Sequence, residues 1–202
     1  MGLLEAIVIT IATIFLTAMF ILSRLFIPLL GFTRYRIPKK LPKEFENAIK
    51  RLERSSRNKE DYAKKSYNYL SKKFHGEPGR VWHDFNGLFI KDVNKLWKKQ
   101  ILHCHQLGYL YRISLVKSKF FSEDDIKVRH KSVFLNLHQY LKVNIGDLKE
   151  KWVKVDIWAK HVGYKFGKTL PMFFVPFKYW KKRKTSFFSF LSVISNIFKK
   201  IF

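Results

Sequence analysis

The spacing of apolar residues changes along the chain, and each spacing predicts a different kind of element. Positions 3–22 are apolar apart from Glu5 and three threonines. A helix of about 20 such residues is long enough to cross the hydrocarbon layer of a bilayer, so we expect a transmembrane helix. No Lys or Arg precedes the run and no A-x-A-like site follows it, which favours a retained anchor over a cleaved signal peptide. The apolar segment 25–32, interrupted by Pro28 and Gly31, is expected to lie along the membrane interface.

Helical spacing of apolar residues recurs in four later segments. Residues 45–52 and 58–70 predict two basic amphipathic helices separated by a break. Residues 101–117 predict a buried helix with Cys104 in its first turn. Residues 187–202 have one apolar face and one face of Ser, Asn and Lys, and they predict an amphipathic helix that makes a second membrane contact, although packing against the domain is an alternative.

Alternation with period two indicates strands in the second half of the chain. The segments 127–133, 135–143 and 151–158 predict three strands, and a turn at 144–147 separates the last two. Helices followed by a hairpin-connected sheet are typical of an α+β fold. We expect an antiparallel sheet.

Composition and breaks in the pattern divide the chain into four parts. We expect a transmembrane anchor with an interfacial segment at 1–32, a basic linker and helix at 33–60, the main domain at 61–170, and a basic aromatic amphipathic tail at 171–202. After an N-terminal span is set aside, the remainder is long enough for one domain with a substantial core.

Positive charge suggests possible partners. Lys+Arg number 40 against 15 Asp+Glu, a formal net charge of +25. Such a surface attracts anionic lipid, nucleic acid or acidic proteins, although a general bias toward Lys is a second explanation. A cluster in the tail is expected to contact the membrane surface, and it comprises Lys181, Lys182, Arg183 and Lys184. Nucleic acid ranks below lipid because no zinc-finger spacing, RNA-binding signature or phosphate-binding Gly loop occurs.

Basic residues follow the predicted span, from Arg24 to Lys43, and none precedes it. The positive-inside rule then predicts a single-pass membrane protein whose domain faces the cytoplasm. The chain has one cysteine, so no intrachain disulfide can form, and a reducing compartment fits best.

Three residues carry candidate chemistry. Cys104 is predicted at a helix N-terminus, where unpaired N–H groups and a neighbouring imidazolium both favour the thiolate. His138 is predicted on one strand and Asp156 on the next, as neighbours across a hairpin. A nucleophile, a base and a group that orients the base are the parts of a catalytic triad.

The order Cys104, His138, Asp156, with the cysteine opening a buried helix and the aspartate in the strand WVKVD, resembles the transglutaminase-like superfamily of papain-like cysteine enzymes. The similarity covers roughly residues 62–167. The resemblance implies acyl transfer, in which the thiolate attacks a peptide or protein amide, and it implies an oxyanion site formed by the Cys104 backbone N–H and one further donor. Gln100 and Trp97 are the candidates for that donor. We expect no cofactor.

Two other interpretations are open. The cluster His103, Cys104 and His105, joined by His130 or His161, suggests a metal site, but adjacent helical residues diverge and no second cysteine exists, so we expect no metal. A non-catalytic basic module that binds anionic membrane or nucleic acid is the alternative function. It predicts salt-dependent binding that survives Cys104→Ala.

Overall fold

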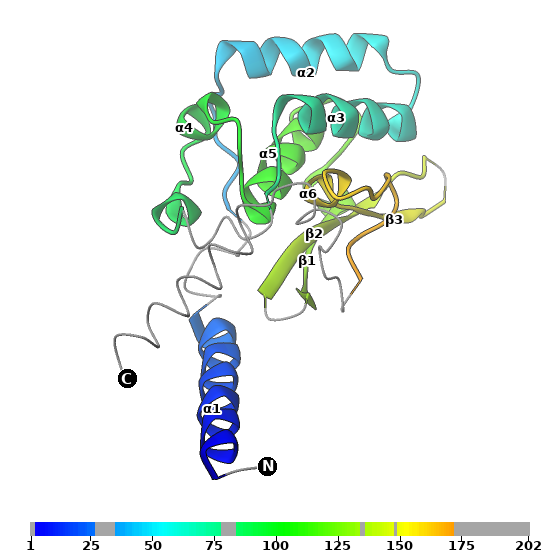
Figure 1. Ribbon diagram of the computed structural model, residues 1–202. Coiled ribbons are helices and arrows are strands. Elements are labelled where there is room, and N and C mark those ends of the chain that lie inside the picture. Colours follow the sequence, from blue (N-terminus) through cyan, green and yellow to red (C-terminus); the bar gives the residue numbers. More distant parts are fainter. Residues whose placement is uncertain (1–2, 27–34, 78–83, 134–135, 148, 172–202) are drawn as a thin grey trace.

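Helices come first along the chain and an antiparallel sheet follows them (Figure 1). The computed structural model describes residues 3–26, 35–77, 84–133, 136–147 and 149–171. Within these ranges the fold is α+β, as the periodicity predicts.

The N-terminal apolar run forms helix α1 (Leu3–Phe26), which lies at the opposite end of the molecule from helix α2 (Figure 1). Many of its apolar side chains are exposed, including Ile11 at 60% and Ile14 and Phe15 at 63%. In the described part of the chain, no helix combines the length and the apolar character needed to cross a membrane. The expected helix is therefore present, but the structure does not support its expected crossing of a bilayer.

Helices α2 (Lys43–Ser55) and α3 (Lys59–Lys73) match the two predicted amphipathic helices. The side chain of Asn58 caps α3 by accepting a hydrogen bond from the Asp61 N–H at 2.9 Å, a favoured way to satisfy a free helix N–H. Phe45 of α2 lies in the same buried cluster as Tyr62 of α3. Helix α2, grouped by composition with the linker, thus packs as part of the domain core.

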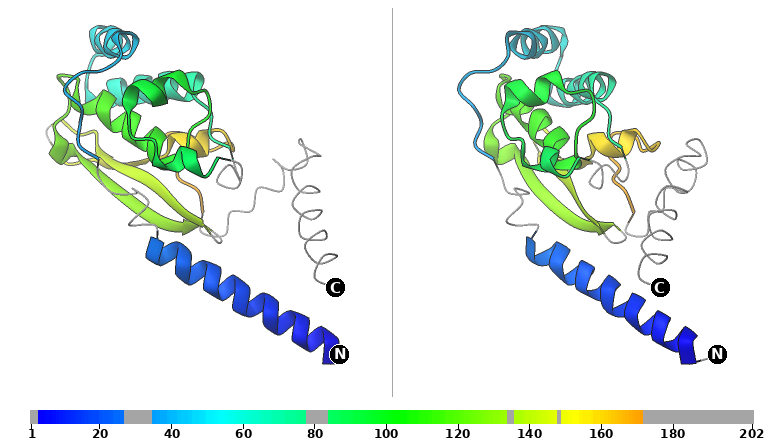
Figure 2. Two further views of the ribbon diagram at one scale, coloured as in Figure 1. Left: turned by 90° about the vertical axis from the view of Figure 1, so that its left-hand side faces the viewer. Right: turned by 60° about the vertical axis from the view of Figure 1, so that its left-hand side comes forward.

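The sheet contains strands β1 (Ile126–Val133), β2 (Asn136–Asn144) and β3 (Trp152–Val155) in the order β1-β2-β3, with both pairs antiparallel. Helix α5 (Cys104–Val116) packs against β2, and helices α2, α3 and α5 lie to one side of the sheet in both views of Figure 2. That inner face contributes Val128, Leu141 and Val155, which are aligned across the three strands.

Among the described residues, four short helices lie between or after these elements: η2 (Asn86–Phe89), α4 (Val93–Lys98), η3 (Glu123–Asp125) and α6 (Ile157–Lys160). The segment around α6 covers one end of the outer face of the sheet, where Val133 packs with Ala159 and Leu170. The opposite end of the same face carries Lys127, Lys142 and Lys154 beside the ring of Trp152.

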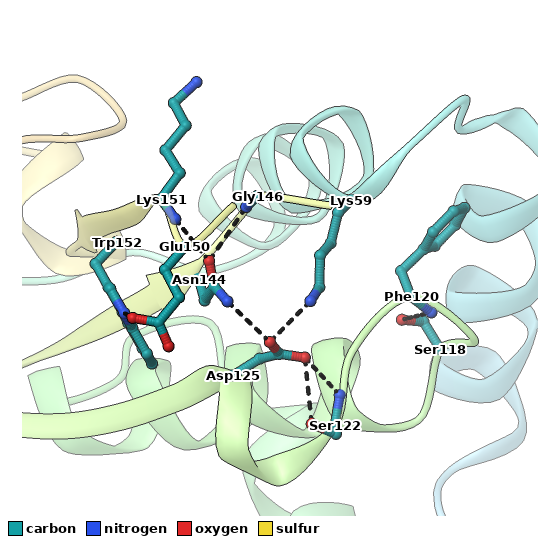
Figure 3. Close-up of polar contacts among 10 residues, drawn as sticks. All are labelled: Lys59, Ser118, Phe120, Ser122, Asp125, Asn144, Gly146, Glu150, Lys151 and Trp152. Atoms are coloured by element: carbon teal, nitrogen blue, oxygen red, sulfur yellow. Dashed lines mark hydrogen bonds and ion pairs between the residues drawn. The ribbon is translucent and has the colours of Figure 1, made fainter. Parts of the chain in front are cut away.

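A side-chain network holds the turn between β2 and β3 (Figure 3). Asn144 accepts hydrogen bonds from the N–H groups of Gly146 at 3.2 Å and Lys151 at 2.9 Å, and its amide donates to Asp125 at 3.3 Å. Asp125 also pairs with Lys59 of α3 at 2.7 Å. The turn, η3 and α3 are therefore joined, which helps to fix the strand register.

The predicted strand 151–158 ends at Val155, because Asp156 leaves the strand to cap α6. The tail 172–202, with Lys181, Lys182, Arg183 and Lys184, and most of the interfacial segment 25–32 lie outside the described residues.

Candidate active site

The N-terminus of α5 presents Cys104. The helix begins at this residue, and the Gln106 side chain accepts a hydrogen bond from the His103 N–H at 3.1 Å. The Gln106 amide also donates to the carbonyls of Gly87 at 2.7 Å and Ile90 at 3.1 Å, which ties the helix start to the η2 segment. Cys104 is half-buried, and the first-turn N–H groups around it have no intrahelical partners. A helix end of this kind favours negative charge.

His138 and Asp156 meet across the hairpin formed by β2 and β3. Leu141 pairs with Val155, so continuation of that register sets Asp156 diagonally opposite His138. The His138 Nε2 lies 2.7 Å from the Asp156 Oδ2, and both residues are buried, at 5% and 3% exposure. The other carboxylate oxygen accepts a hydrogen bond from the Ala159 N–H at 3.0 Å. Asp156 therefore orients the imidazole while it caps α6.

The electrostatics link these residues to the thiol. Burial by itself would raise the pKa of Cys104, but the positive charge of His138 and hydrogen bonds with His105 and His138 outweigh it and lower the pKa to about 5. Burial would lower the pKa of His138, but the charges of Asp156 and Cys104 and the hydrogen bonds to them raise it to about 10. At neutral pH the pair is therefore a thiolate and an imidazolium.

The environment of the imidazole selects which nitrogen faces the thiol. Since Nε2 is bonded to Asp156, Nδ1 remains for Cys104. Trp158 packs edge-on to the His138 ring with centroids 5.6 Å apart. Gly76 permits this packing, because a Cβ at that position would lie 2.3 Å from the Trp158 ring. The base is thus held by a carboxylate and by an aromatic side chain.

The two candidate oxyanion donors have other surroundings. The Trp97 indole N–H donates to Glu44 at 3.0 Å, and its ring stacks on Phe45 with centroids 4.3 Å apart. Gln100 is exposed, and its backbone carbonyl accepts a hydrogen bond from the His75 N–H at 2.8 Å. Thus Cys104, His138 and Asp156 come together, and Trp97 has a packing role in the core.

Three residues at the site were not assigned these roles from the sequence. His105 helps to lower the pKa of Cys104, and its Nε2 lies 2.9 Å from the Leu88 carbonyl, whereas its position beside Cys104 suggested only a metal ligand. Gln106 stands three residues after the cap, a spacing that indicates a capping box. No local sequence pattern predicted the role of Trp158, because its contact with His138 depends on strand pairing.

The metal interpretation has no geometric support. Among the described residues, no group of three or more His, Cys, Asp and Glu side chains is arranged to hold a metal ion. The rings of His103 and His105 instead stack, with centroids 5.9 Å apart.

Comparison of the chain with family models, curated proteins and solved structures finds no match. The resemblance to transglutaminase-like enzymes therefore rests on the residues and their arrangement alone.

Proposed function

We propose that the protein is a transglutaminase-like cysteine enzyme that transfers or hydrolyses acyl groups of peptide or protein amides. The observation that carries the proposal is the buried His138–Asp156 pair at 2.7 Å, whose imidazolium charge lowers the pKa of Cys104 at the start of α5. A lowered thiol pKa combined with an oriented base is characteristic of nucleophilic cysteine sites.

In the proposed reaction the Cys104 thiolate attacks the amide carbonyl carbon, and a C–S bond forms. The His138 imidazolium gives its proton to the departing nitrogen as the C–N bond breaks, which leaves a thioester and a neutral imidazole. Water or an amine then attacks the thioester while His138 accepts its proton, and the thiolate is regenerated. Developing negative charge on oxygen would lie near the first-turn N–H groups of α5.

An activated ester tests this chemistry without knowledge of the natural substrate. We expect the full chain in detergent to react with p-nitrophenyl acetate, to release p-nitrophenolate and to carry an acetyl group on Cys104 that peptide mapping detects. Hydroxylamine or a primary amine should discharge it. At pH 6, His138→Gln should slow acetylation, and Cys104→Ala measures the background at lysines. Equal acetylation of Cys104 at pH 6 in wild type and His138→Gln would refute the proposed role of the imidazole.

We further propose that helix α1 attaches the protein to a membrane, with the domain on the cytoplasmic side. Two observations support this. The exposed apolar side chains of α1 would lose contact with water on entering lipid, and basic residues follow the helix. We expect the full chain to float with liposomes. The double variant Ile11→Asp, Ile14→Asp should not float with them. Labelling of Cys104 by a membrane-impermeant maleimide, in vesicles of known orientation, reports the side of the membrane on which the domain lies.

A further inference from the structure

The outer face of the sheet carries positive charge beside the candidate active site. Lys127, Lys142 and Lys154 are directly opposite one another in the strand register, and we name these three residues the lysine row. Lys127 and Lys154 are exposed and Lys142 is half-buried. Like charges directly opposite one another destabilise a sheet, so the row has a cost that a partner of opposite charge would remove.

Carboxylates of the domain do not neutralise the row. No ion pair of Lys127, Lys142 or Lys154 occurs among the residues that the structure describes, and the same holds for Arg129, the next basic residue on this face. Lys127 lies instead over the Trp152 ring, 4.1 Å from its centroid. By contrast, Lys59, which also lies near the β2–β3 turn, pairs with Asp125 (Figure 3).

The row is continuous with the site along β2. Lys142, Tyr140 and His138 project from the same face of the strand, since their positions differ by two. Segment 156–170 covers the His138 end of this face, where Val133 packs with Ala159 and Leu170. At about 3.3 Å per residue, Lys142 lies roughly 13 Å along the strand from His138.

We propose that the lysine row binds acidic side chains of an extended peptide or protein segment whose amide reacts at Cys104. This inference rests on the proposed function, because acyl transfer to Cys104 requires an amide substrate at the adjoining site. An extended peptide has the same rise as a strand, so the acidic residues would lie about four residues from the reacting amide. Charge complementarity therefore selects acidic peptides over neutral ones.

Protection of Cys104 from alkylation by iodoacetamide tests the proposal in the full chain, held in detergent. The probes are a peptide of alternating Glu and Gln and a Gln-rich neutral peptide of equal length. The test variant combines Lys127→Gln, Lys142→Gln and Lys154→Gln. The matched control combines Lys50→Gln, Arg51→Gln and Arg54→Gln, which removes equal charge from the basic surface of α2.

We expect the acidic peptide to slow alkylation of the wild type and the neutral peptide to have no effect. The half-protecting concentration should rise roughly tenfold in the lysine-row variant, as expected for loss of three exposed ion pairs, and change little in the control. The alkylation rate without peptide reports the reactivity of the Cys104 thiol, and protection by the peptide reports binding. A failure of the proposed chemistry is therefore distinguished from a failure of peptide binding.

Three results would overturn the proposal. The first is a lysine-row variant that is protected as well as the wild type, and the second is an α2 control that loses as much protection as the lysine-row variant. In the third case, anionic vesicles or an oligonucleotide protect Cys104 through the row and the acidic peptide does not, which would assign the face to lipid or nucleic acid.

Discussion

The pH dependence of Cys104 alkylation is the sharpest consequence of the site geometry. In the wild type the thiol pKa is lowered to about 5, so the thiolate is almost fully formed at pH 6. In His138→Gln the imidazolium is absent, and burial leaves an ordinary or raised pKa of ~8.5 or above. At pH 6 the thiolate fractions then differ by ~300-fold.

The rates differ by less than the thiolate fractions, because a thiolate of lower pKa is a weaker nucleophile. A Brønsted coefficient of ~0.4–0.5 over ~3.5 pKa units reduces the reactivity of the wild-type thiolate by ~40-fold. The wild type should therefore be only ~5–10-fold faster at pH 6, the two rates should cross near pH ~7, and the variant should be ~30-fold faster at pH 9.

The assay is alkylation of the full chain by iodoacetamide from pH 5 to 10, followed by intact mass. The chain has one cysteine, so a single mass increase reports Cys104. His130→Gln is the control, since His130 lies on β1 and its Nε2 is 3.2 Å from the Gln139 side chain. A wild-type rate that climbs through pH 8–9 with the same midpoint as His138→Gln would refute the thiolate–imidazolium pair.

The same pKa shifts predict how stability depends on pH. The pKa of Cys104 is lowered in the folded state to about 5, so its contribution is present above its unfolded pKa and is lost as pH falls through about 5. The pKa of His138 is raised to about 10, so its contribution is present below its unfolded pKa and is lost as pH rises through about 10. The thermal midpoint of the wild type, relative to Cys104→Ala, should therefore decline toward both limits.

Three other substitutions test separate parts of the structure. Gly76→Ala should displace Trp158 from His138 and move the alkylation midpoint of Cys104 to higher pH; an unchanged midpoint would contradict the role of that contact. Lys142→Gln should raise stability by ~0.5 kcal/mol in thermal unfolding, because it relieves repulsion between directly opposite lysines. Asn58→Ala should lower stability by ~1 kcal/mol through loss of the α3 cap, and Asn58→Asp, which keeps the acceptor, should not.

Local signals are sufficient for most helices and strands. The start of α3 was predicted at Asn58. The ends of β1 and β2 lie no more than one residue from their predicted positions. These predictions succeed because caps and apolar periodicity act within a few residues of sequence. Strand β3 was predicted too long, since Asp156 is equally compatible with a strand and with the cap of a short helix.

The sequence by itself determined the α+β class, the apolar N-terminal helix, the excess of positive charge and the placement of a lone cysteine at the start of α5. Only the tertiary structure decided that Asp156 bonds both His138 and α6, that Trp97 is committed to Glu44, and that Trp158 packs on the imidazole. It also aligned the lysine row across three strands. These contacts depend on strand register and helix packing, which are set by the whole core and leave no signal in any one segment.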